Sequence, residues 1–228
     1  MKNNIKDVFF DLDHTLWDFE KNSSLTFQKI FEDNQLPTNL DSFLEEYVPI
    51  NFLYWKGFRE GEVDKETLRF GRLNDTFNKL ETPVSKDVIH KLSDDYLTHL
   101  SSFNYLFDDT ISVLNYLHSK YNLHIITNGF EAVQTTKLKN SNIHHYFKTV
   151  TNSEEAGVKK PHPDIFNYAL EKAKATVGTS IMIGDNLEAD ILGGINAGFQ
   201  TIYFNEIPLT QHNHITQIYK LIELKDYL

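Results

Sequence analysis

Two aspartates, Asp11 and Asp13, stand two residues apart where a short apolar run ends. Because side chains of an extended strand alternate with a period of two, both carboxylates point to the same side of the chain. Such a pair can combine covalent attack by one carboxylate with proton donation to the departing oxygen by the other. The structural alternative is a loop in which an aspartate caps the following helix.

Other polar groups follow later apolar runs. Thr127 precedes Asn128 and Gly129, which offer a hydroxyl and turn amides before a predicted helix whose N-terminal N–H groups favour an anion. Taken alone, this pattern also fits a plain strand-to-helix cap. The same ambiguity applies to Asp185 after the run that ends in Gly184, because helix N-termini attract aspartate for structural reasons.

Lys160 lies just before another predicted helix, where a lone lysine is normally a solvated surface charge. Five such groups in order at one edge of a sheet are hard to explain as independent caps. They favour a single catalytic site that contains Asp11, Asp13, Thr127, Lys160 and Asp185.

Predicted strands and helices alternate along the chain after residue 103, and these elements must position the polar residues. Predicted strands cover residues 6–10, 123–127, 148–151, 180–183 and 200–204. Predicted helices cover residues 110–119, 130–140, 163–174 and 187–197, and a helical segment ends the chain. This order predicts an α/β fold with a doubly wound, Rossmann-like parallel sheet, which binds ligands at the carboxyl ends of its strands.

A helical stretch interrupts this pattern directly after the first strand. Its apolar residues keep helical spacing, and turn-forming residues divide it into four or five predicted helices, at Pro37, Pro49, Gly57, Gly61 and Pro83. We expect a catalytic core of residues 1–15 and 101–228, and an inserted all-helical cap domain of residues 16–100.

The motifs resemble those of the haloacid dehalogenase superfamily. Four segments carry the resemblance: Asp11-Leu12-Asp13-His14-Thr15-Leu16, Ile126-Thr127-Asn128-Gly129, Lys160-Pro161, and Gly184-Asp185-Asn186-Leu187-Glu188-Ala189-Asp190. The helical insertion is similar to the first cap type of that superfamily. The resemblance implies that Asp11 becomes phosphorylated and that Asp13 acts as acid and then base.

The resemblance also implies roles for the other motif residues. The residues implied to hold the phosphate are Leu12, Thr127, Asn128, Gly129 and Lys160. Metal ligation is implied for Asp11, Asp185 and the backbone carbonyl of Asp13, while Asp190 and Asn186 would support these groups from outside. His14 is expected to have a structural role.

Electrostatics independently favour a metal ion. Carboxylates that face a phosphate repel it, at a cost of about 4 kcal/mol per like-charge pair 4 Å apart in an effective dielectric of 20. One lysine cannot offset that repulsion, whereas a hard divalent cation with oxygen ligands can. We therefore expect Mg²⁺ as the cofactor.

Asp13 favours hydrolysis of a phosphate monoester over dehalogenation, because an alkoxide leaving group needs a proton and a halide does not. The segments 51–63, 127–130 and 191–198 resemble a bacterial branch of 5′-nucleotidases that act on pyrimidine and non-standard nucleotides. Alternative functions are a sugar-phosphate or phosphoglycolate phosphatase, a phosphoglucomutase, or a phospho-ligand binding protein without turnover.

Substrate choice is expected to lie in the cap. Trp55, Phe58 and Arg59 belong to a segment that combines large apolar groups with cations, and they could form a face that stacks on a nucleobase. The alternative is that they pack between cap helices.

The amino-acid composition limits the classes of partner that the chain can have. The chain has 22 Lys plus Arg against 32 Asp plus Glu, a formal charge of −10, which disfavours nucleic-acid polymers. It contains no cysteine, so disulfides and thiolate sites are excluded. No apolar run reaches the roughly 20 residues of a membrane span. We expect a cytoplasmic monomer or homodimer that acts on a small phosphorylated metabolite and has no membrane partner.

Overall fold

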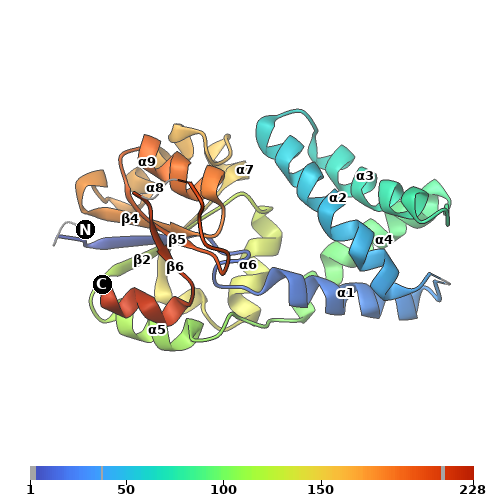
Figure 1. Ribbon diagram of the computed structural model, residues 1–228, viewed down its shortest axis with the longest axis horizontal. Helices are drawn as coiled ribbons and strands as arrows, with labels where there is room; N and C mark the ends of the chain where they lie inside the picture. The colour runs from blue at the N-terminus through green and yellow to red at the C-terminus, as the bar shows by residue number, and fades with distance from the viewer. Residues whose placement is uncertain (1–3, 37, 212–213) are drawn as a thin grey trace. The chain divides into compact units, whose positions relative to one another are not determined.

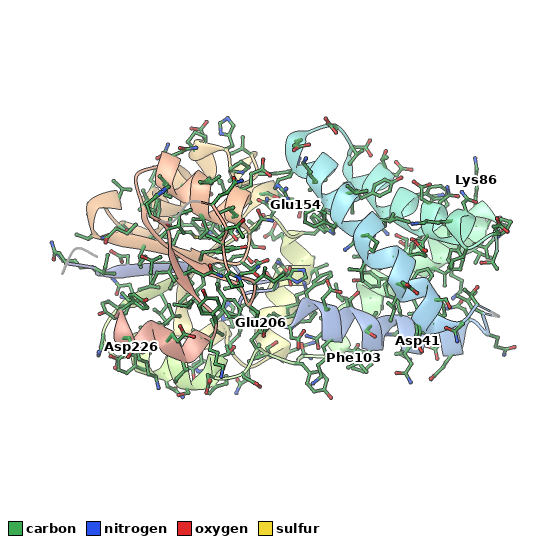
Figure 2. The ribbon with its side chains drawn as sticks, in the orientation of Figure 1. Asp41, Lys86, Phe103, Glu154, Glu206 and Asp226 are labelled. Carbon is green, nitrogen blue, oxygen red and sulfur yellow. The ribbon has the colours of Figure 1, made fainter. Side chains whose placement is uncertain are left out.

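The computed structural model describes residues 4–36, 38–211 and 214–228. These residues form two compact units (Figure 1). An α/β unit combines the chain up to Phe19 with Asn104–Leu228, and a helical unit comprises Glu20–Phe103. Phe103, labelled in Figure 2, is the last residue of the helical unit.

A six-stranded parallel sheet with the order β3-β2-β1-β4-β5-β6 forms the centre of the α/β unit. The strands are β1 (Asp7–Phe10), β2 (Asn122–Thr127), β3 (Phe147–Asn152), β4 (Ser180–Gly184), β5 (Gln200–Phe204) and β6 (Thr216–Ile218). All four residues of β1 are buried, as expected for a central parallel strand that is covered on both faces. The predicted doubly wound parallel sheet is confirmed.

Helices cover both faces of this sheet (Figure 1). They are α5 (Thr110–His118), α6 (Glu131–Asn140), α7 (Ser153–Ala156), α8 (Pro163–Ala173) and α9 (Gly193–Asn196), with short helical turns η2 (His144–Tyr146), η3 (Val177–Thr179), η4 (Leu187–Leu192) and η5 (Leu221–Asp226). On one face, Ile165 and Phe166 of α8 pack with Phe9 of β1 and Met182 of β4. On the other, α5 lies beside η5.

The starts of α6 and α7 are joined by a hydrogen bond. The backbone N–H of Glu131 donates to the Glu154 carboxylate over 2.8 Å, and Glu154 is labelled in Figure 2. This bond satisfies one of the N–H groups that a helix leaves unpaired in its first turn.

Helices α1 (Phe19–Asp33), α2 (Leu40–Glu60), α3 (Lys65–Lys79), α4 (Lys86–His99) and the turn η1 (Leu100–Ser102) make up the inserted segment. Polar side chains begin three of these helices: Asn39, Asp64 and Ser85 each accept a backbone N–H from the first turn. Aromatic side chains fill the unit, with the ring of Phe27 in contact with Phe43, Tyr47 and Tyr96. No helix in the described ranges has the length and apolar character needed to cross a membrane.

Some predicted helix breaks were wrong. Pro49 and Gly57 lie inside α2, which runs to Glu60 and ends at Gly61 with φ of 80°. A proline inside a helix costs about 3 kcal/mol. Pro49 is on the exposed face, where water can bond the carbonyl that it leaves unpaired, and burial of the opposite face outweighs the loss. Pro37 lies outside the described residues.

Two elements near the C-terminus also differ from prediction. The single helix predicted over residues 187–197 is a π-helical turn, η4, followed by α9. The C-terminal segment holds the edge strand β6 before η5. Three residues are too few for a strand pattern to appear in the sequence, and pairing with β5 forms this strand.

Candidate active site

The carboxyl ends of three neighbouring strands gather the predicted polar groups. Strand β1 lies between β2 and β4, so the residues that follow β1 lie between Thr127, the last residue of β2, and the residues that follow β4. The N–H of Asp11 donates to the carbonyl of Ile183 over 2.9 Å, which extends the β1–β4 pairing by one residue. Asp11 and Asp185 therefore flank the point where the strand order reverses, the usual ligand site of such sheets.

Lys160 brings a buried positive charge to the aspartates that follow β1 and β4. Its Nζ lies 2.6 Å from Asp11 Oδ1, 2.6 Å from the carbonyl oxygen of Ile126 and 2.7 Å from Asp190 Oδ1. Its side chain is 2% exposed. The three donors of the ammonium thus face three acceptors, and Lys160 is held between two carboxylates inside the protein.

Three carboxylates meet at this point. One oxygen from each of Asp11, Asp185 and Asp190 lies within 4.8 Å of the others. The Thr15 hydroxyl donates to Asp185 Oδ1 over 3.2 Å, and the Asn186 N–H donates to Asp190 Oδ2 over 3.0 Å. Since both Asp190 oxygens are engaged, by Lys160 and by this N–H, Asp190 is placed to support the cluster.

Gly184 makes this packing possible. A Cβ atom at Gly184 would collide with the Asp190 carboxylate. A glycine is therefore required at the end of β4 for Asp190 to approach the strand.

The buried charges shift one another's ionisation. Burial raises the pKa of Asp11 well above its usual range; Lys160 opposes this shift and the charges of Asp190 and Asp185 add to it. Burial and then the charge of Asp190 raise the pKa of Asp185 to about 8. Burial alone would lower the pKa of Lys160, but the charges of Asp11 and Asp190 raise it.

These groups fit a hard divalent cation. The cluster offers only oxygen ligands, which Mg²⁺ and Ca²⁺ prefer. One ammonium against three carboxylates leaves negative charge uncompensated, and a bound cation would offset it. Asp11 and Asp185 have carboxylate oxygens that could serve, together with the backbone carbonyl of Asp13.

Thr127 is placed to donate to an anion. Its Oγ1 accepts the N–H of Gly129 over 3.1 Å and the Gln134 Nε2 over 2.7 Å. Among the described residues, nothing accepts a hydrogen bond from this hydroxyl. A buried O–H without an acceptor is available to a phosphate oxygen.

Asn128 holds the Lys160 loop. Its side-chain amide donates to the carbonyl of Lys160 over 2.9 Å and its Oδ1 accepts the N–H of Lys160 over 2.8 Å. The side chain of Leu12 is fully buried. The side chains of Asn128 and Leu12 are thus engaged elsewhere, and Gly129 has none. Only the backbone N–H groups of these three residues could contact a phosphate.

Two residues missed by the sequence reasoning contact Asp13. Lys137 Nζ lies 2.6 Å from Asp13 Oδ1, and Gln134 Nε2 donates to Asp13 Oδ2 over 2.9 Å. Both are buried on α6, three residues apart, so they face the same side of the helix. That spacing is the one signal in the sequence that could have marked them.

The three predicted substrate residues lie on α2 of the helical unit. Phe58 is 8% exposed, whereas Trp55 and Arg59 are half-buried. The Trp55 and Phe58 rings meet edge to face, with centroids 5.6 Å apart. Near Asp13, His14 takes a φ of 64° and its ring lies 4.8 Å from that of Phe19, which gives it a structural contact.

Comparison with known proteins decides the family. Residues 5–198 match the model of the haloacid dehalogenase-like hydrolases. The chain belongs to this family. It is therefore a hydrolase whose four sequence motifs coincide with the clustered residues.

Relatives of this hydrolase include two nucleotidases. The chain is 33% identical to the pyrimidine 5′-nucleotidase YjjG of Escherichia coli over 87% of its own length and 85% of the relative's. It is 30% identical to the pyrimidine 5′-nucleotidase PynA of Streptococcus pneumoniae, over 98% and 93% of the two chains.

The solved structures include a similar haloacid dehalogenase-like hydrolase. The putative hydrolase YfnB of Bacillus subtilis, bound to magnesium, superposes with a TM-score of 0.89 at 28% identity, covering 99% of each chain.

Proposed function

We propose that this chain is a Mg²⁺-dependent phosphatase that hydrolyses a nucleoside 5′-monophosphate through an aspartyl phosphate on Asp11. The main support for this proposal is the buried cluster of Asp11, Lys160 and Asp185. The hydroxyl of Thr127 can donate a hydrogen bond to a phosphate bound beside this cluster. When bound, Mg²⁺ would offset the carboxylate charges and polarise a phosphoryl oxygen.

In the first step, the Asp11 carboxylate attacks phosphorus and the bond from phosphorus to the ester oxygen breaks. Asp13 gives its proton to that oxygen, so the alcohol leaves in neutral form. Thr127 donates to a phosphoryl oxygen, and the charge of Lys160 attracts the phosphoryl group. Lys160 donates to Asp11 and forms an ion pair with Asp190 in the structure, and the contact with Asp11 orients the nucleophile beside the phosphate site.

In the second step, water attacks the phosphorus of the aspartyl phosphate and passes a proton to Asp13. The bond between Asp11 and phosphorus breaks, which releases inorganic phosphate and restores both aspartates. Each proton that Asp13 gives in the first step thus returns in the second.

The assignment of the substrate is supported by the two relatives named as pyrimidine 5′-nucleotidases. The side chain that we propose for stacking on the base is Trp55 on α2, which is half-buried. The chain is expected to act on a small phosphorylated metabolite.

The test is phosphate release from nitrophenyl phosphate with Mg²⁺, followed by a panel of phosphorylated metabolites. We expect turnover of the aryl phosphate and the highest kcat/KM for nucleoside 5′-monophosphates. Highest kcat/KM for a sugar phosphate or phosphoglycolate would reject the nucleotidase assignment. No phosphate release from any member of the panel would reject the phosphatase.

A further inference from the structure

Asp13 is held from both sides by buried groups of α6. Its Oδ1 lies 2.6 Å from Lys137 Nζ, and its Oδ2 accepts a hydrogen bond of 2.9 Å from Gln134 Nε2. The Lys137 side chain is 2% exposed, while that of Asp13 is 22% exposed. One end of this contact is thus fixed inside the protein, and the other faces the site.

The surroundings of Lys137 restrict where its ammonium can go. Its Nζ lies 4.2 Å from the centroid of the Trp17 ring and 5.1 Å from that of Phe19, within the range of cation–π attraction. Trp17 also forms a backbone bridge with Asp13. The ammonium of Lys137 is therefore packed against the turn that contains Asp13, and this packing fixes its position relative to Asp13.

Gln134 connects Asp13 to Thr127. Its Nε2 donates to the Asp13 carboxylate and also to Thr127 Oγ1, over 2.7 Å. Because a carboxylate accepts and does not donate when ionised, the NH₂ group of this amide must face Asp13. Its Oε1 is buried and has no hydrogen-bond partner among the described residues, so the two contacts of Nε2 set the orientation of the amide.

We propose that Lys137 and Gln134 are positioning residues that hold the Asp13 carboxyl at the place from which it exchanges its proton with the ester oxygen. Gln134 further ties that place to the hydroxyl of Thr127. The inference rests on the proposed function, in which Asp13 is the acid and base. Lys137 contacts the site through Asp13, and Gln134 contacts it through Asp13 and Thr127.

A buried ion pair can also be purely structural, and breaking one destabilises a protein without any selective effect on chemistry. The two roles differ in what they change. A positioning residue affects the step that needs the proton, so its loss is greater for a poor leaving group than for a good one. A structural residue affects all substrates together.

The central experiment compares Lys137→Met with Lys139→Met, an exposed position on the same helix. We expect Lys137→Met to lower kcat for an alkyl phosphate roughly 10 to 100-fold, the scale of a misplaced catalytic group, with KM nearly unchanged. The loss should be smaller for nitrophenyl phosphate. Lys139→Met should match the wild type. Equal losses for both substrates would overturn the proposal.

A double variant separates action through Asp13 from general damage. In the Asp13→Asn background, Lys137→Met should cause little further loss of kcat, because groups that act as a unit are not additive. A full additional loss would overturn the proposal. Melting curves of all variants show whether each one is folded at the assay temperature.

Two further variants keep the test decisive if Lys137→Met does not fold. Lys137→Arg retains the charge and should recover most of kcat, and Gln134→Met keeps the volume but should show the same preference for the aryl substrate. Wild-type rates for Gln134→Met would overturn its assigned role. Failure of the proposed function is distinguishable, because the wild type would then release no phosphate or Asp13→Asn would spare alkyl phosphates.

Discussion

Lys160 Nζ lies 2.6 Å from Asp11 Oδ1, and both side chains are at most one-tenth exposed. A second carboxylate, that of Asp190, lies 2.7 Å from the same ammonium. Lys160 therefore offsets part of the cost of burying these carboxylates, and it holds the Asp11 carboxylate in one orientation. Asp185 belongs to the same carboxylate cluster and accepts the Thr15 hydroxyl, and we propose it as a ligand of a bound cation.

We predict that Mg²⁺ raises the melting temperature of the wild type and that Asp185→Asn abolishes this increase. A ligand that binds only the folded state stabilises it by about 2.7 kcal/mol at 100 times its Kd. Thermal melts in excess chelator and in excess Mg²⁺ measure the effect. Asp164→Asn, at an exposed acid, is the control that should keep the wild-type increase. An unchanged increase in Asp185→Asn would exclude Asp185 as a ligand.

Asp13→Asn should slow turnover of an alkyl phosphate by roughly 10² to 10⁴, the range of general acid–base catalysis. The loss should shrink for nitrophenyl phosphate, whose leaving group needs less help from a proton. Steady-state kinetics on both substrates check this. If both lost the same factor, Asp13 would not be the proton donor.

Trp55→Ala should lower kcat/KM for nucleoside monophosphates about 5 to 150-fold, if stacking on a base contributes the 1 to 3 kcal/mol that is typical of aromatic platforms. Nitrophenyl phosphate should be hydrolysed almost as before. Phe58→Ala is the comparison, because Phe58 is buried and its truncation should lower the melting temperature. If Trp55→Ala left the ratio of kcat/KM for nucleoside monophosphates to that for nitrophenyl phosphate unchanged, Trp55 would serve only in packing between helices.

His124 should make stability depend on pH. Its ring is stacked on Phe9 with centroids 4.6 Å apart, and burial lowers its pKa, while Asp7 acts in the opposite direction. Because the unfolded chain binds the proton more readily, the free energy of unfolding should fall as the pH drops through about 6.5.

Urea unfolding at pH 7.5 and 5.5 measures this loss of stability. His124→Phe keeps a ring against Phe9, and Asp7 retains the amide of Asn122 as its donor, so the variant should lose less stability than the wild type. His144→Asn, at an exposed position, is the control. A loss in His124→Phe as large as in the wild type would refute this role of His124.

The edge of the sheet at which these residues gather could be predicted from the sequence, because strand order and periodicity determine it. Parallel strands end at the same edge, so Asp11, Thr127 and Asp185 had to meet once the alternation of strands and helices was clear. Lys160 could be placed there because it begins a connection back to the sheet. The roles of these residues stay predictions until they are tested.

The contacts of Asp13 could not be predicted. Gln134 and Lys137 lie more than 120 residues from Asp13 along the chain, and α6 is polar on most of its surface, so no amphipathic pattern marks its buried side. The continuation of α2 through Pro49 could not be predicted either. It depends on which face of the helix the tertiary packing leaves exposed.

The most direct measurement is phosphate release by Asp11→Asn, together with the mass of the protein quenched in acid during turnover. The amide keeps the shape of Asp11 but lacks the nucleophilic charge. We predict that wild-type protein carries one added phosphoryl group at Asp11 during turnover and that Asp11→Asn neither gains this mass nor releases phosphate. Phosphate release at the wild-type rate by folded Asp11→Asn would contradict it.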